Sequence, residues 1–218
     1  MTTTTTRSVW ATNDPARGAA PLAGETTYDV CVIGGGIAGL TTAYLLADAG
    51  KSVVVLEAKS AVAGGETEHT TAHLAWVIDD RFSRLASIRG DDNAALAAKS
   101  HQSAIDLIEE IVRRERIGCD IRRVDGYLFA GADGPQAVRD ELVALARLVL
   151  ACERVDRAPL PAGDTGPAIR FPDNGQFHPL KYLGALAAAI RAKGGVIHTD
   201  TPVVKVDAGP PCVAHTRD

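Results

Sequence analysis

The chain is poor in cysteine, and the spacing of its cysteines excludes the common ways in which they build a site. The 218 residues include Cys31, Cys119, Cys152 and Cys212, with no C-x-x-C pair and no Cys-x-His among them. Zinc and iron–sulfur centres need closely spaced Cys or His ligands. The sequence therefore predicts no metal site within this chain and favours a reduced, cytoplasmic protein.

Long apolar runs and concentrated positive charge are missing as well. No stretch of about 18 apolar residues occurs, and residues 1–7 (MTTTTTR) lack the apolar core of a signal peptide. We therefore expect neither export nor a membrane partner. The formal net charge is −4, and Lys and Arg are scattered rather than gathered into a stripe. This distribution argues against nucleic acid as a partner.

The composition that remains is that of a folded globular protein. Apolar residues make up 46% and charged residues 23% of the chain, close to the averages for soluble domains. The length suits one large domain or two interleaved small ones, with a substantial core. Residues 1–27, rich in Thr, Pro, Ala and Gly, are expected to form a flexible, poorly ordered arm.

A strand, a helix and a second strand are predicted directly after this arm. The apolar run 28–33 is rich in β-branched residues and ends at three glycines, which is typical of a buried parallel strand. From Ile37 the apolar positions recur at spacings of three and four until Gly50. A second buried strand over 52–56 ends at Glu57. This order predicts a right-handed crossover and an α/β, Rossmann-like fold.

A glycine-rich pattern of the form G-x-G-x-x-G joins the first strand to the helix. It consists of Gly34, Gly35, Gly36, Ile37, Ala38 and Gly39. The first glycine makes the turn, the second admits a pyrophosphate and the third lets the helix pack on the strand. Unpaired N–H groups and the positive helix dipole then stabilise a diphosphate. Glu57, about twenty residues further on, accepts ribose hydroxyls and disfavours a 2′-phosphate, so the pattern predicts FAD or NAD rather than NADP.

The rest of the chain is predicted to be an insertion followed by a return to the same sheet. The expected elements are a loop over 63–73, a long helix over 91–116, a β-hairpin turning at Asp125-Gly126, a helix over 136–150, a short strand over 168–171, a helix over 180–193, and strands over 196–199 and 203–206. Residues 212–218 have the pattern of a strand with nothing after it to pair with, which favours a truncated chain.

Several segments together carry a family resemblance. Residues 29–40 with 55–58 resemble the FAD-dependent oxidoreductases of the D-amino acid oxidase and glycine oxidase superfamily. Residues 64–74 and 171–182 are similar to the branch whose longer members carry a C-terminal Rieske iron–sulfur domain. The resemblance implies FAD as cofactor and an amine or amino acid as substrate. It also implies a Rieske electron partner outside this chain, which has no Rieske ligands.

The resemblance also implies functions for individual residues and segments. The loop is expected to run beside the flavin pyrophosphate and ring through Thr67, Thr71, Ala72 and His73, and backbone groups near Val203 to hold adenine. Lys59 is expected either to cover the adenosine edge or simply to be solvated, and His73 either to tune the flavin or to be satisfied by backbone groups. Glu68-His69 departs from the Gly-Arg-like pair expected there.

These expectations divide the chain into regions. Residues 28–90 form the FAD-binding βαβ unit with its flavin loop, 91–179 an inserted helical and β segment of the substrate domain, and 180–218 an incomplete return to the FAD-binding domain.

Three functions stay open on the sequence alone. The first is an FAD-dependent oxidoreductase that passes hydride from an amine or amino acid to flavin N5. No catalytic base is assigned, because this oxidation chiefly needs the substrate C–H held over N5. The second is a non-catalytic fragment that keeps the fold without holding FAD firmly. The third is an NAD-dependent dehydrogenase, which the long insertion after the second strand disfavours.

Overall fold

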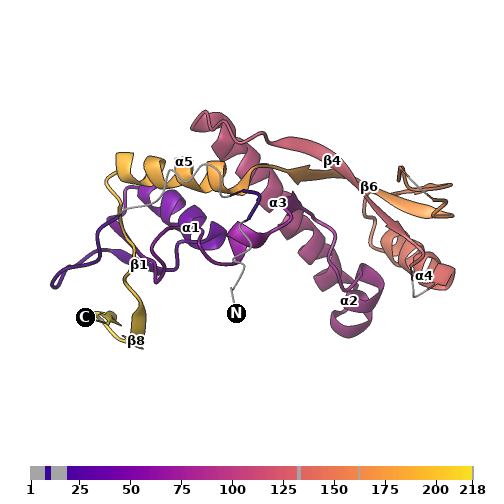
Figure 1. The fold of residues 1–218 in the computed structure, drawn as a ribbon. Helices are drawn as coiled ribbons and strands as arrows, with labels where there is room; N and C mark the ends of the chain where they lie inside the picture. The colour runs from indigo at the N-terminus through magenta and orange to yellow at the C-terminus, as the bar shows by residue number, and fades with distance from the viewer. Residues whose placement is uncertain (1–7, 11–18, 132–133, 162, 218) are drawn as a thin grey trace, which may run out of the picture. The chain divides into compact units, whose positions relative to one another are not determined.

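The structure is a computed structural model that describes residues 8–10, 19–131, 134–161 and 163–217 (Figure 1). The chain forms two compact units. Unit 1 comprises residues 1–71, 115–119 and 178–218, and unit 2 comprises residues 72–114 and 120–177. Residues 1–7 and 11–18 of the expected arm, and Asp218 at the other end, lie outside the described residues.

Unit 1 is built on a parallel three-stranded sheet in the order β1-β2-β7. Its strands are β1 (Val30–Ile33), β2 (Val53–Leu56) and β7 (Val196–His198), and helix α1 (Ile37–Asp48) makes the crossover from β1 to β2. This arrangement confirms the predicted strand, helix and strand. The central strand β2 is buried at every position. The prediction that β1 is fully buried is wrong, because this strand pairs only with β2 among the described residues and alternates between half-buried and exposed positions.

Helix α5 (Pro179–Ala192) packs against α1 in unit 1 (Figure 1). Its packing face includes Tyr182, Leu183, Leu186 and Ile190, which are all buried. Burial raises the pKa of Tyr182 to about 12, so its phenol stays neutral in the core. The helix begins at His178, whose ring nitrogen Nδ1 accepts a hydrogen bond of 3.3 Å from the Lys181 amide. The helix predicted over 180–193 is therefore confirmed.

The last two strands of the chain form a sheet of their own. Strand β8 (Val203–Asp207) pairs antiparallel with β9 (Val213–Thr216), through the short connection over 208–212. The expectation that 203–206 rejoins the first sheet is wrong, whereas β7 does join it. The strand expected within 212–218 corresponds to β9, and its partner β8 precedes it in the chain. Each of these two strands satisfies the backbone N–H and C=O groups of the other, which unpaired strands would leave to solvent.

Unit 2 contains an antiparallel sheet in the order β3-β6-β4, with β5 also paired to β6. Its elements are β3 (His73–Leu74), α2 (Phe82–Arg89), α3 (Asp91–Arg114), β4 (Arg122–Phe129), α4 (Gly134–Arg147), β5 (Glu153–Val155) and β6 (Ala168–Gln176). The predicted helices over 91–116 and 136–150 correspond to α3 and α4. The short strand expected over 168–171 is nine residues long, and α2 and β5 were not predicted.

An aromatic cluster forms the centre of the unit 2 core. Trp76, Phe82 and Phe171 are fully or almost fully buried. The Trp76 and Phe171 rings meet edge to face at 5.5 Å between centroids, an arrangement that aromatic quadrupoles favour. The Trp76 indole nitrogen Nε1 donates to the Pro172 carbonyl at 2.7 Å, so this large side chain is buried without leaving its polar atom unpaired.

The β-hairpin predicted at Asp125-Gly126 is wrong. Strand β4 continues through both residues, and its register with β6 shifts between Val124 and Gly126, which defines a β-bulge. Arg170 on β6 donates from Nε to the Asp125 carboxylate at 2.7 Å. A Cβ atom on Gly126 would lie 3.1 Å from the side-chain nitrogen of Asn174. Asp125 and Gly126 therefore contribute to the contact between β4 and β6, and the chain does not reverse direction there.

Glu141 is a buried carboxylate that joins α4 to the start of α2. Its side chain is fully buried, and its two oxygens accept hydrogen bonds of 2.8 Å from the amides of Phe82 and Ser83. The first amides of a helix have no partner within the helix, and the helix dipole favours negative charge there. Glu141 therefore satisfies two donors that would otherwise be unpaired.

We expect Glu141→Ala to lower the free energy of unfolding by about 3 kcal/mol, because both amides lose their acceptor in a buried place. The neighbouring Asp140→Ala is the matched control. Its carboxylate is exposed and accepts from the Gln136 side chain, so we expect a change of about 0.5 kcal/mol or less. Urea denaturation followed by circular dichroism measures both, and equal losses in the two variants would contradict this role of Glu141.

Candidate functional site

The glycine-rich turn brings the start of α1 into contact with the end of β1. Gly34 has a φ of 102°, a left-handed conformation that favours glycine, and its amide donates to the Leu56 carbonyl at 2.8 Å. A Cβ atom at Gly39 would lie 1.9 Å from the Gly34 carbonyl oxygen. Only a residue without a side chain can occupy this position. The helix therefore begins directly at the carboxyl ends of β1 and β2.

The first turn of α1 has the properties of an anion site. Gly36 is its N-cap residue, and within the part of the chain that the structure describes no side chain caps the helix or places an acid in its first turn. The amides there point out of the helix with the positive end of its dipole. A Cβ atom on Gly36 would have its first neighbour, the Thr67 hydroxyl oxygen, at 3.7 Å. Space for a ligand and a hydroxyl donor thus occur together.

The Glu57 carboxylate lies beside the same turn. Its Oε2 accepts from the Gly35 amide at 2.6 Å, and its Oε1 accepts from the Lys59 amide at 2.7 Å. The amide of Gly35 is therefore satisfied inside the protein, which leaves the amides of the first turn of α1 for a diphosphate. A carboxylate has about four acceptor positions. Two positions remain for hydroxyl groups of a ligand.

Unit 1 brings most of the predicted site residues together. Gly34 to Gly39 and Glu57 meet at the turn, and Thr67 approaches Gly36 from the 3₁₀ helix η1 (Glu66–His69). Lys59 lies two residues after Glu57 with an exposed side chain, and Thr71 ends this part of unit 1. Val203 belongs to β8, opposite Thr216 in the separate two-stranded sheet.

Ala72 and His73, the last two predicted site residues, belong to unit 2. Ala72 is buried and has a φ of 63°, which is uncommon for a residue other than glycine. His73 begins β3 and is paired in register with Gln176. The segment expected to be an irregular loop over 63–73 therefore contains a 3₁₀ turn and the start of a strand.

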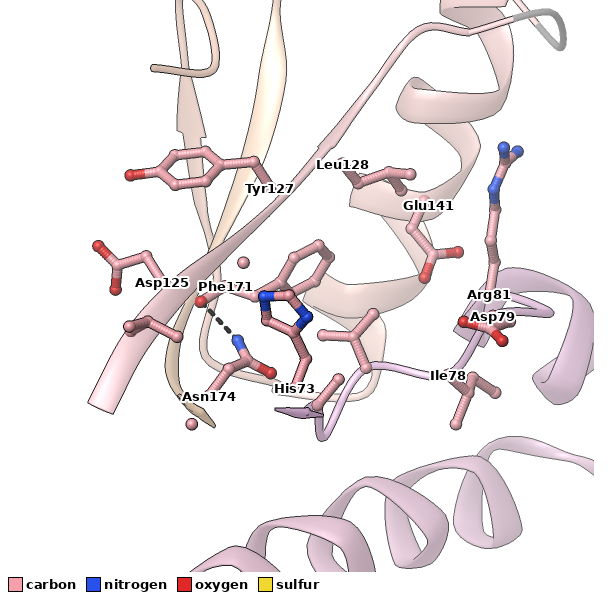
Figure 2. Close-up of a pocket in the computed structure, with 15 residues that line it drawn as sticks. His73, Ile78, Asp79, Arg81, Asp125, Tyr127, Leu128, Glu141, Phe171 and Asn174 are labelled. Carbon is pink, nitrogen blue, oxygen red and sulfur yellow. Dashed lines mark hydrogen bonds between the residues drawn. The ribbon is translucent and has the colours of Figure 1, made fainter. Parts of the chain in front are cut away.

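Unit 2 has a cavity of about 370 Å³. Figure 2 shows the His73 ring near its centre, with Phe171 beside it and Tyr127 and Arg81 on different sides. Asn174 is occupied by the protein itself, since it donates to the Phe171 carbonyl at 2.9 Å and accepts from the Trp76 amide at 3.0 Å. Apolar walls with a few hydrogen-bonding groups are typical of small-molecule sites.

Arg81 also lines the cavity, and no pattern in the sequence pointed to it. It precedes α2 with a φ of 66°, and a left-handed backbone at a residue other than glycine is one mark of functional loops. A lone arginine outside any motif carries no such signal in the sequence. Tyr127 on β4 also lines this cavity.

The comparison with protein families identifies the class. The family DAO, described as FAD dependent oxidoreductase, matches residues 29–217. The chain therefore belongs to the DAO family of FAD-dependent oxidoreductases, which confirms the resemblance seen in the sequence. FAD is the cofactor of this family, and the alternative of an NAD-dependent dehydrogenase has no support from it.

Two curated relatives show what this chain is similar to. The Bacillus subtilis protein YhfW, whose name describes a Rieske 2Fe-2S iron-sulfur protein, is 35% identical over 201 residues, which are 92% of this chain and 39% of that protein. The gamma-glutamylputrescine oxidoreductase of Escherichia coli is 29% identical over 197 residues, covering 87% of this chain and 46% of that enzyme. The chain thus spans less than half the length of either relative.

Solved structures share the fold. The glycine oxidase of Geobacillus kaustophilus has a TM-score of 0.69 at 19% identity, over 87% of this chain and 51% of that one. The L-amino acid deaminase of Proteus myxofaciens has a TM-score of 0.68 at 18% identity, over 89% and 43%. These likenesses confirm the α/β, Rossmann-like fold class.

The residues of unit 1 fit the cofactor of the family. The first turn of α1 offers donors without a side-chain cap, Gly36 leaves room beside them, and Glu57 retains acceptor positions at the sheet edge. Among the described residues, no group of three or more His, Cys, Asp or Glu side chains is placed to hold a metal ion. None of the described helices is both long and apolar enough to cross a membrane.

We expect Gly39→Ala to lower the free energy of unfolding by about 3 kcal/mol or more, since the new methyl group would overlap a backbone oxygen. Gly118→Ala is the matched control, because a Cβ atom there meets nothing within 4 Å and should change stability by about 0.5 kcal/mol or less. Urea denaturation checks both. Parent-like stability of Gly39→Ala would show that the turn does not need this close contact.

Proposed function

We propose that the protein containing this chain is an FAD-dependent oxidoreductase that oxidises an amine or amino acid. The observation that carries the proposal is the arrangement at the turn, where donors of α1 lie beside a fixed Glu57 carboxylate. The names of a gamma-glutamylputrescine oxidoreductase and a glycine oxidase among the similar proteins support the substrate class. Both named substrates carry a nitrogen next to a carbon that can be oxidised.

Each proposed cofactor contact follows from the chemistry of the residue. Amides of the first turn of α1 hold the diphosphate, and the Thr67 hydroxyl adds a donor beside them. Glu57 accepts from the ribose hydroxyls. The other proposed contacts are Lys59 at the adenosine edge, backbone groups of Val203 at adenine, and Thr71, Ala72 and His73 along the flavin.

The cavity of unit 2 is the proposed substrate site. His73 and Tyr127 offer hydrogen-bonding groups to orient a polar substrate, and the Phe171 ring offers an apolar wall that excludes water. When bound, FAD supplies the two-electron acceptor, with hydride leaving the substrate carbon for flavin N5 and the imine product hydrolysing in water. The reaction needs orientation of the C–H bond more than a strong base, and the cavity walls provide this.

A Rieske iron–sulfur domain outside this chain is the proposed partner that accepts electrons. Its support is the similarity to YhfW, whose name describes such a protein. Molecular oxygen is the alternative acceptor. The cytoplasmic location inferred from the sequence stays a prediction.

FAD binding is the first test. The purified protein should show flavin absorption in the visible range, and added FAD at a hundredfold excess over Kd should stabilise the folded state by about 2.7 kcal/mol. Urea denaturation with and without FAD measures this shift. Absence of any shift would favour the non-catalytic fragment, and a shift with NAD alone would contradict the proposal.

The second test concerns Glu57. Glu57→Gln removes the charge and one acceptor, so we expect the Kd for FAD to rise about tenfold. Glu110→Gln is the matched control, since Glu110 is exposed on α3, where it pairs with Arg114. Flavin fluorescence titration measures both variants. Equal Kd values would place the ribose away from Glu57.

A further inference from the structure

Ser8 and Trp10, near the start of the chain, are bonded to the loop that carries Thr67. The Trp10 indole nitrogen Nε1 donates to the Thr70 carbonyl at 2.9 Å, and the Ser8 hydroxyl donates to the Glu68 carbonyl. The Trp10 amide in turn donates to the Ser8 hydroxyl oxygen at 3.2 Å. The two side chains therefore form hydrogen bonds with the backbone carbonyls on both sides of His69.

Trp10 packs against His178, a residue that is held by hydrogen bonds of its own. The Trp10 ring meets the His178 ring edge to face, with 5.1 Å between centroids. His178 is held by its own role as the N-cap of α5 and by its amide, which donates to the Cys119 carbonyl at 2.7 Å. Trp10 thus connects the loop to a fixed corner of unit 1.

The loop contacts other parts of unit 1, including helix α5. Helix η1 (Glu66–His69) is a four-residue 3₁₀ turn in which none of the residues is buried. Such short turns have poor hydrogen-bond geometry, and segments with few buried contacts open readily. Contacts from outside the turn must therefore determine how often the loop is in the observed position.

That position matters for the candidate cofactor site. Thr67 immediately precedes Glu68, whose carbonyl Ser8 binds, and the Thr67 hydroxyl lies beside Gly36 at the N-terminus of α1. Opening of the loop at Glu68 and Thr70 would carry this hydroxyl away from the first turn of the helix.

We propose that Ser8 and Trp10 are positioning residues that clamp the loop Glu66–Thr70 against unit 1 and so hold Thr67 for the diphosphate of FAD. This inference rests on the proposed function. Ser8 and Trp10 thus help to retain the cofactor through the loop, and neither residue needs to touch the cofactor itself.

Variants of the purified protein test the clamp by two measurements. The double variant Ser8→Ala/Trp10→Ala loses two hydrogen bonds and one aromatic contact, which shifts the loop equilibrium towards the open form by about a hundredfold. If a loop that is mostly closed becomes mostly open, the apparent Kd for FAD rises about tenfold. Cleavage by a glutamate-specific protease after Glu66 and Glu68, measured without flavin, should accelerate by about the same factor.

Milder variants separate positioning from folding. Trp10→Phe keeps the ring contact with His178 and loses only the donor to Thr70, so both effects should be smaller than in the double variant. Ser52→Ala is the matched control for Ser8→Ala, because the Ser52 hydroxyl is exposed and bonds Asp29 at the opposite end of β2 from Glu57. Circular dichroism without flavin should give the same spectrum for all variants.

The outcomes separate the clamp from the proposed function. Weaker FAD binding and faster cleavage in the Ser8 and Trp10 variants, with neither in Ser52→Ala, support the clamp. Parent-like Kd and cleavage in the double variant overturn it. If the parent protein binds no FAD, the proposed function fails, and the cleavage rates alone decide whether the loop is clamped.

Discussion

The contact between the backbone of Gly34 and the start of α1 is the constraint on which the rest of unit 1 depends. At Gly39 any side-chain carbon would lie 1.9 Å from the Gly34 carbonyl oxygen, so the helix can begin this close to β1 only with glycine. Because β1 and β2 are parallel, their carboxyl ends share one edge of the sheet. The close contact therefore places the first amides of α1 at the edge of the sheet where Glu57 follows β2.

Glu57 places a negatively charged carboxylate at that edge of the sheet, in an orientation that does not depend on a ligand. A carboxylate on a free side chain would lose rotamer entropy on binding a ribose, and that loss would weaken the complex. Here two backbone amides, those of Gly35 and Lys59, already hold it in one orientation. The same negative charge opposes a 2′-phosphate. If Glu57 binds the ribose as proposed, selectivity and orientation both come from this one side chain, which backbone amides already hold in place.

The sequence predicted well the elements that depend on residues close to one another in the chain. It failed where contacts with residues distant in the chain decide the structure. The strand, helix and strand around Gly34 to Gly39 depend on neighbours within a few residues, so periodicity and glycine spacing sufficed. Asp125-Gly126 carries a strong local turn signal, yet Arg170, 45 residues away, binds the Asp125 carboxylate within a continuous strand. Strand β6 contains Pro172 and Gly175, which locally signal a break, and only its position between paired neighbours keeps it extended. The Trp10 contact follows from the same kind of distant partner, because no pattern near Trp10 points to Thr70.

The segment from Glu66 to Leu74 shows how such distant partners serve a site. Its first half is held at Glu68 and Thr70 by Ser8 and Trp10, and its second half is paired with β6. Between the two anchors Ala72 has a φ of 63° while being buried, a conformation that costs about 1 kcal/mol for a residue with a side chain. Its carbonyl accepts from the Phe177 amide. A strained residue persists only where contacts on both sides outweigh its cost, and such residues cluster at functional loops. Within unit 2, the positive φ of the buried Ala72 therefore persists because the Phe177 amide and the pairing of β3 with β6 hold the backbone on its C-terminal side.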